Sequence, residues 1–87
     1  MSDYPTLLYA EIAERHRLDA ELGERMREAI IVHVQNRDPA KVATDPQGAY
    51  DETIGFLRKA NKHWQKQLRA NHRTAREIVA AREADHD

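Results

Sequence analysis

The sequence of 87 residues contains no cysteine. This absence excludes disulfide bonds, thiolate metal ligands and thiol nucleophiles, and it fits a reducing cytoplasm. Ser2 is the only serine, so a nucleophilic triad has no candidate residue. No glycine-rich loop of the kind that cradles phosphates is present either. We therefore assign no catalytic residue and predict a protein that is not an enzyme.

Long apolar runs are missing as well. No segment approaches the roughly 18 uninterrupted apolar residues of a membrane span, and the first residues lack the basic and apolar regions of a signal peptide. We expect a cytoplasmic protein with no membrane partner. The five histidines include no pair at i,i+4 spacing, so the sequence predicts no metal site and no cofactor.

Glycine and proline are rare, and their positions divide the chain. Pro39, Pro46 and Gly48 lie close together in the middle, whereas the stretches on both sides are rich in helix formers. The sequence predicts two long helices within a single domain, with these approximate bounds: helix 5–36, linker 37–45, helix 46–82 and a frayed acidic tail at 83–87.

The linker carries two helix-start signals. Asp38-Pro39 and Asp45-Pro46 each match an N-cap acceptor followed by proline in the first helical turn. The second dipeptide should begin the second long helix, and the first predicts a short third helix or turn. The fold class is therefore all-α, a long antiparallel helical hairpin. Because two helices alone cannot enclose a core, we expect a homodimer that forms a four-helix bundle.

The first long segment has one broad apolar face that also contains charge. At about 100° per residue, Glu11, Arg15 and Asp19 project into the same sector as the apolar residues. They form either a polar site inside a bundle or a self-neutralising series at the edge of the seam. Gly23 marks either the close approach of a neighbour or a helix break, and we favour one continuous helix. The apolar members of the face are Leu7, Leu8, Ile12, Leu18, Leu22, Met26, Ala29 and Ile30.

The end of this segment is apolar on nearly every side. Ile30, Ile31, Val32 and Val34 point in different directions around the helix, and a single partner helix cannot cover them all. They predict an interface with a second subunit or a contact with the linker.

The second long segment repeats every seven residues. Trp64 and Asn71 occupy one seam position of this repeat together with Tyr50, Leu57 and Ile78, and Ala81 belongs to the other seam position. Trp64 is expected to anchor the core, and we include Trp64 and Asn71 in the predicted oligomer interface. Polar seam residues such as Gln67, Asn71 and Thr74 fix register, line a ligand pocket or are simply exposed.

A stretch without acids runs through this second segment. Seven basic residues and no aspartate or glutamate lie between Thr53 and Arg76 in a chain of formal net charge −1. On a helix these residues face away from the seam. They form a solvated face, a phosphate-backbone contact or a contact with an acidic protein. The candidate partner- or phosphate-binding residues are Arg58, Lys62, Lys66, Arg69, Arg73 and Arg76.

Two short stretches resemble the small all-helical chorismate mutases. Glu24 to Ala29 looks like the arginine-bearing part of their first helix, and Asp45-Pro46 looks like the dipeptide before their second. The resemblance implies a dimeric helical architecture. Gln47 and Gly48 stand where those enzymes carry an Arg-Glu pair of the active site, so the resemblance does not extend to their activity.

These features favour a non-enzymatic helical interaction or regulatory protein that docks on another macromolecule through charged helix faces. The alternative is sequence-nonspecific binding of a nucleic-acid backbone by the basic residues of the second helix. A more distant alternative is a small bundle enzyme of chorismate-mutase-like architecture, in which Glu11, Arg15 and Asp19 face Gln67 and Asn71.

Overall fold

A computed structural model describes residues 3–86, and this part is almost entirely helical and contains no strand. The helix α1 spans Tyr4–Gln35, the short helix α2 spans Pro39–Thr44 and the helix α3 spans Pro46–His86. The predicted all-α hairpin is confirmed, and so is the short helical piece in its linker. The helix α3 continues four residues past the predicted end at 82. The last residue of the predicted frayed tail, Asp87, lies outside the described residues.

Each helix begins at an aspartate that caps it. The backbone N–H of Thr6 donates to Asp3 Oδ1 at 3.0 Å, that of Ala40 to Asp38 Oδ1 at 3.0 Å, and that of Gly48 to Asp45 Oδ1 at 3.0 Å. A proline follows in the first turn, where a backbone N–H is not needed. The two helix-start signals in the linker therefore have the function that the sequence predicted.

Gly48 lies directly beside the third cap. A Cβ atom at this position would overlap the carboxylate of Asp45. Glycine removes that obstacle, so the carboxylate can lie over the first turn of α3 and accept from the Gly48 N–H.

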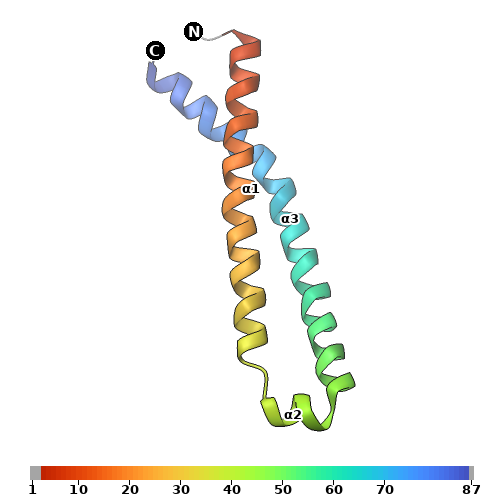
Figure 1. Ribbon diagram of the computed structural model, residues 1–87. Coiled ribbons are helices and arrows are strands. Elements are labelled where there is room, and N and C mark those ends of the chain that lie inside the picture. The colour runs from red at the N-terminus through yellow and green to blue at the C-terminus, as the bar shows by residue number, and fades with distance from the viewer. Residues whose placement is uncertain (1–2, 87) are drawn as a thin grey trace.

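The hairpin is a thin rod rather than a globule. α1 and α3 run antiparallel and cross near the end opposite to α2, and α1 begins at the same end at which α3 finishes (Figure 1). The Cα atoms extend over 64 × 17 × 15 Å, with a radius of gyration of 19.3 Å. A compact domain of this length would have a radius of gyration of about 12 Å. Few side chains are therefore enclosed, and the buried apolar ones in the described part are Leu22, Ala49, Trp64, Ala75 and Val79.

The predicted seven-residue seam of α3 is wrong at its ends. Tyr50 is 59% exposed and Ala81 is exposed, whereas Val79, which the repeat left out, is buried. A straight α-helix has 3.6 residues per turn, so a seven-residue repeat drifts around it by about 20° per heptad. The positions at Ala49, Ala60 and Asn71, which stay covered, are instead spaced by 11 residues. This spacing follows the contact face of a nearly straight helix.

The helix α1 is continuous through Gly23, as expected. Of its predicted apolar face, Leu22 is buried, and four residues are half-buried, namely Leu7, Leu18, Met26 and Ile30. Leu8 and Ile12 remain 40% and 44% exposed. The single partner helix thus covers only the centre of this face.

Candidate interaction surfaces

The basic residues of α3 form an exposed row on the side opposite to the seam. We call Arg58, Lys62, Lys66, Arg69 and Arg73 the basic ridge. All five are exposed, and none has an acidic partner within ion-pair distance among residues 3–86. At about 1.5 Å per residue the ridge is roughly 22 Å long. Lys66, Arg69 and Arg73 surround the small Ala70 in a shallow depression.

Arg76, the sixth predicted member, belongs partly to the seam. Its Nε lies 4.0 Å from Glu11 Oε2 on α1, and its Nη2 lies 3.3 Å from His72 Nε2. The prediction that Arg76 faces away from the seam is therefore corrected, because the crossing of the two helices brings Glu11 of α1 within its reach.

The acids of α1 that contact α3 do not neutralise the basic ridge. Glu14 is buried and forms an ion pair with Arg82 near the crossing of the helices. It also accepts from Arg17 Nε at 2.9 Å. The Arg17 guanidinium, followed by that of Arg82, holds the pKa of the Glu14 carboxyl below its ordinary value. Asp19 accepts from Asn71. The acids of α1 that contact α3 thus pair with seam residues and not with the basic ridge, whose charge is not neutralised.

The alternatives for Glu11, Arg15 and Asp19 can now be compared with their contacts. Arg15 Nε lies 3.8 Å from Asp19 Oδ2, as a self-neutralising series requires. Glu11 reaches across to Arg76 instead. Asp19 also accepts from Asn71 Nδ2 at 2.9 Å, which brings together two residues of the hypothetical enzyme site.

Another member of that hypothetical site, Gln67, lines a different hollow. Its neighbours there are Leu22, Arg25, His63 and Trp64. The polar residues of the hypothetical enzyme site are thus distributed along the seam. Glu11 and Asp19 contact α3, whereas Arg15 pairs within α1.

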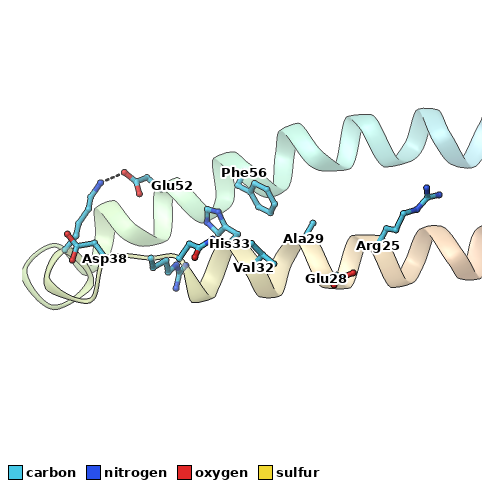
Figure 2. Close-up of a pocket in the computed structure, with 11 residues that line it drawn as sticks. Arg25, Glu28, Ala29, Val32, His33, Asp38, Glu52 and Phe56 are labelled. Atoms are coloured by element: carbon cyan, nitrogen blue, oxygen red, sulfur yellow. Dashed lines mark hydrogen bonds and ion pairs between the residues drawn. The ribbon is translucent and has the colours of Figure 1, made fainter.

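A groove lies between α1 and α3 near the α2 linker (Figure 2). This loop-end groove has a volume of about 630 Å³. At its base the ring of His33 stacks on Phe56, with centroids 4.3 Å apart and planes 6° from parallel. His33 Nε2 lies 3.3 Å from the Thr53 hydroxyl, which also accepts from Arg37. The residues that line the groove are Arg25, Glu28, Ala29, Val32, His33, Asn36, Arg37, Asp38, Lys41, Glu52 and Phe56.

The charges around the loop-end groove balance. Three cations, Arg25, Arg37 and Lys41, face three acids at its rim. Lys41 forms an ion pair with Glu52, and this hydrogen bond raises the pKa of the Lys41 ammonium above its ordinary value. The groove therefore presents no single sign of charge, and its contacts join the linker to both long helices. Sequence patterns did not predict this cluster, because its members come from three separate elements.

The predicted oligomer interface splits into two groups. Ile31, Val32 and Val34 are 41%, 47% and 46% exposed, so neither α3 nor the linker covers them. Trp64 and Asn71 are buried between α1 and α3 of a single chain. Trp64 is thus a core anchor, as expected, and a role for these two residues between subunits stays a prediction.

Two classes of site find no support in the described part of the chain. Residues 3–86 contain no group of three or more histidine, aspartate or glutamate side chains placed to hold a metal ion. Within the same residues, no helix combines the length and apolar character that crossing a membrane requires.

Comparison of the chain with protein-family models, curated proteins and solved structures finds no match. The resemblance to helical chorismate mutases therefore stays confined to its two short stretches. In the second of these, Gln47 is exposed and donates to Asp51 Oδ1 at 3.0 Å. A function has to be argued from the surfaces themselves.

Proposed function

We propose that this protein is a non-enzymatic helical interaction module that docks on an acidic macromolecule through the basic ridge. The observation that carries the proposal is the ridge itself, five exposed cations on one side of α3 without an acidic partner in the described chain. A helix that is merely solvated usually interleaves both signs, because i,i+4 pairs of opposite charge stabilise it. An uncompensated row of one sign attracts and orients an anionic surface.

An acidic protein is the partner that we favour. The chain as a whole has a formal net charge of −1, so it lacks the large positive excess that is typical of general nucleic-acid binding. A ridge of about 22 Å suits one or two helices of a partner protein. Acting as a regulator of that partner would require only reversible docking and no chemistry.

A nucleic-acid backbone is the second candidate because of the spacing of the ridge. Steps of three and four residues place a positive charge about every 5–6 Å along the helix, which is comparable to the separation of phosphates along a strand. Such binding would be insensitive to sequence, since only the backbone would be contacted.

We also propose that the protein is a homodimer in the cytoplasm, with two hairpins packed into a four-helix bundle. Single domains of this size bury little surface, and the extended shape reduces that burial further. Large apolar side chains remain exposed along α1, including Ile12 and Val34. A second hairpin would cover them, and the absence of cysteine fits a reducing compartment.

The test compares two charge-reversal variants of equal net charge. Lys66→Glu with Arg69→Glu changes the ridge, and Arg25→Glu with Arg27→Glu changes two exposed cations of α1. Each replacement changes the charge by −2, so both variants carry −5 instead of −1. Binding of an acidic helical polypeptide and of a labelled DNA duplex is measured at 50 mM salt, with helicity checked by circular dichroism.

We expect the ridge variant to lose about tenfold or more in affinity, because exposed ion pairs contribute about 0.2–1 kcal/mol each and the change replaces attraction by repulsion. The α1 variant should lose much less. Tighter binding of the duplex, with a log–log salt slope of about −4 to −5 for five phosphate contacts, would select the nucleic acid. Equal losses in both variants, or no binding of either probe, would exclude the ridge as a docking surface.

A further inference from the structure

The loop-end groove shows which flanks of the two long helices share one side of the hairpin. Arg25 and Val32 of α1 line it together with Glu52 and Phe56 of α3. Since one flank of each helix borders this groove, the remaining flanks of α1 and α3 lie together on the opposite side.

That opposite side gathers apolar side chains towards both of its ends, with Asp19 of α1 and Asn61 of α3 between them. At about 100° per residue, it collects side chains from both helices, and we call it the apolar face. Two hollows of α3 lie at its edge. One is lined by Ile54, Leu57 and Asn61 and the other by Tyr50, Asp51, Ile54 and Gly55, and Arg58 of the basic ridge borders both. Most of its members are exposed or half-buried, and Val79 is buried. The apolar face consists of Leu8, Ile12, Met26, Ile30 and Val34 from α1 and of Tyr50, Ile54, Leu57, Leu68 and Val79 from α3.

The side of the rod that carries the apolar face is large enough for a stable dimer. One broad side of a rod of 64 × 17 Å measures roughly 1,000 Å², and a standard protein interface buries about 800 Å² on each partner. A second hairpin that stacked on this side would therefore need only part of it.

Gly23 leaves room for a close approach on α1. It lies on the same flank as Ile12 and Ile30, and a Cβ atom at this position would meet nothing within 4 Å in the chain. A helix from outside the chain can therefore approach the backbone of α1 closely on this side.

We propose that the apolar face binds the apolar face of a second copy of this chain, with α3 of one protomer lying over α1 of its partner. This inference rests on the homodimer proposed above and defines its interface. It assigns Ile30 and Val34 to the interface, whereas Val32 faces the loop-end groove. The basic ridges then lie on opposite outer edges of the bundle. Lys62, Lys66, Arg69 and Arg73 remain open to acidic partners, and Arg58 borders the interface.

Charge decides between the two possible two-fold arrangements. With the symmetry axis along the rod, α3 faces the α1 of the partner, and both α2 linkers lie at the same end. With the axis across the rod, α3 faces the other α3, and the acid-free stretches of the two protomers come together. α1 carries six acids and four arginines, whereas residues 53–76 carry seven bases and no acid. Opposite charge favours the first arrangement.

A matched pair of variants tests the interface. Val34→Lys places a charge in the apolar face, and Val32→Lys places the same charge on the other side at nearly equal exposure, 46% against 47%. Light scattering should give twice the chain mass for the wild-type protein and for Val32→Lys, and the mass of one chain for Val34→Lys. A monomeric wild-type protein, or dissociation of both variants, would overturn the proposal.

A distance measurement tests the arrangement. Ala43 is exposed on α2, and the chain has no cysteine of its own, so Ala43→Cys can carry a single spin label. Helices pack about 8–10 Å apart, and labels at the same end should therefore lie within roughly 30 Å of each other. Labels separated by a distance near the 64 Å length of the rod would overturn the pairing of α3 with α1.

Binding of the acidic probes by Val34→Lys separates this proposal from the function of the ridge. If the variant is monomeric and still binds through the ridge, with affinity lowered by less than threefold, the interface and the ridge are independent. A dimeric wild-type protein that binds no acidic probe would support the interface and reject the proposed docking function.

Discussion

Glu14 is the residue on which the crossing of the helices depends most. It is buried, forms ion pairs with Arg17 and Arg82, and thereby joins the first half of α1 to the last turns of α3. A buried carboxylate is stable only when such partners satisfy it. Loss of either its charge or its partners should therefore loosen the end at which α1 begins and α3 finishes.

The pH dependence of stability should report this carboxylate. Because the pKa of Glu14 is lower in the folded chain than its ordinary value of 4.5, its contribution is fully present above pH 4.5 and is lost as the pH falls through the lowered pKa. Glu14→Gln should be less stable than the wild-type protein at pH 7, and the difference should close as the pH falls below 4.5 and through the lowered pKa of Glu14. Urea denaturation at a series of pH values measures it.

Arg17→Gln serves as a check on that interpretation, since it removes the first cause of the lowered pKa and leaves the carboxyl in place. At pH 7, Arg17→Gln should unfold at a lower urea concentration than the wild-type protein, and in acid the two unfolding midpoints should approach each other. A difference between Glu14→Gln and the wild-type protein that stayed constant with pH would mean that the carboxylate charge contributes nothing.

At the scale of the element, the start of α3 depends on one aspartate and one glycine. Asp45 caps the helix, and Gly48 leaves space for its carboxylate. Alanine at position 48 would improve helix propensity by about 0.5–1 kcal/mol, but it would displace the cap, which is worth about 1 kcal/mol.

A double-mutant cycle separates these two effects. Gly48→Ala alone should change the free energy of unfolding little, because gain and loss offset each other. In an Asp45→Ala background the same replacement should stabilise by about 0.5–1 kcal/mol, since no cap remains to be displaced. Chemical denaturation of the wild-type protein, the two single variants and the double variant gives the coupling free energy between positions 45 and 48. Equal effects of Gly48→Ala in both backgrounds would contradict the proposed overlap.

The helices themselves could be predicted from sequence because their signals are local. Asp45 and Pro46 act within one turn, and the helix start that they predict is the one observed. The contact face of α3 was predicted correctly from Thr53 to Ile78 but not at Tyr50 and Ala81, because a seven-residue repeat accumulates an angular error with distance. The pair of Glu14 with Arg82 could not be predicted, since it depends on how two helices cross.

Among the candidate surfaces, too, the features of a single helix could be predicted from sequence, whereas those that depend on the packing of two helices could not. The exposure of Lys66 and Arg69 could be predicted from their position opposite Trp64 on one helix. The loop-end groove could not, because His33, Thr53 and Phe56 meet only after the linker has set the distance between α1 and α3. The role of Val34 required knowledge of which helix flanks share a side.

At the scale of the whole molecule, the proposed dimer predicts different responses at two similar glycines. Gly23 and Gly55 both lie inside helices, and an added Cβ would meet nothing within 4 Å at either position. Gly55 lies at the edge of the apolar face, beside the hollow of Tyr50 and Ile54, whereas Gly23 lies within the face. Gly55→Ala should therefore stabilise by about 0.5–1 kcal/mol through helix propensity. Gly23→Ala should stabilise less, or destabilise, because the partner helix approaches it.

Thermal denaturation at several protein concentrations measures both variants. The wild-type midpoint should rise with concentration, because dissociation accompanies unfolding of a dimer. Gly55→Ala should show the same dependence on protein concentration, with a thermal midpoint above that of the wild-type protein. Gly23→Ala should need a higher protein concentration than the wild-type protein to reach the same thermal midpoint. Identical behaviour of the two variants would show that no helix packs against Gly23.

The shared end at which α1 begins and α3 finishes has a practical consequence (Figure 1). A tag or a neighbouring domain attached to either end of the chain would hold the rod from the same side. The turn that contains α2 would then point away from the attachment, and Lys66 and Arg69 would face sideways into solution. Immobilisation through either end should thus give the same access to an acidic partner.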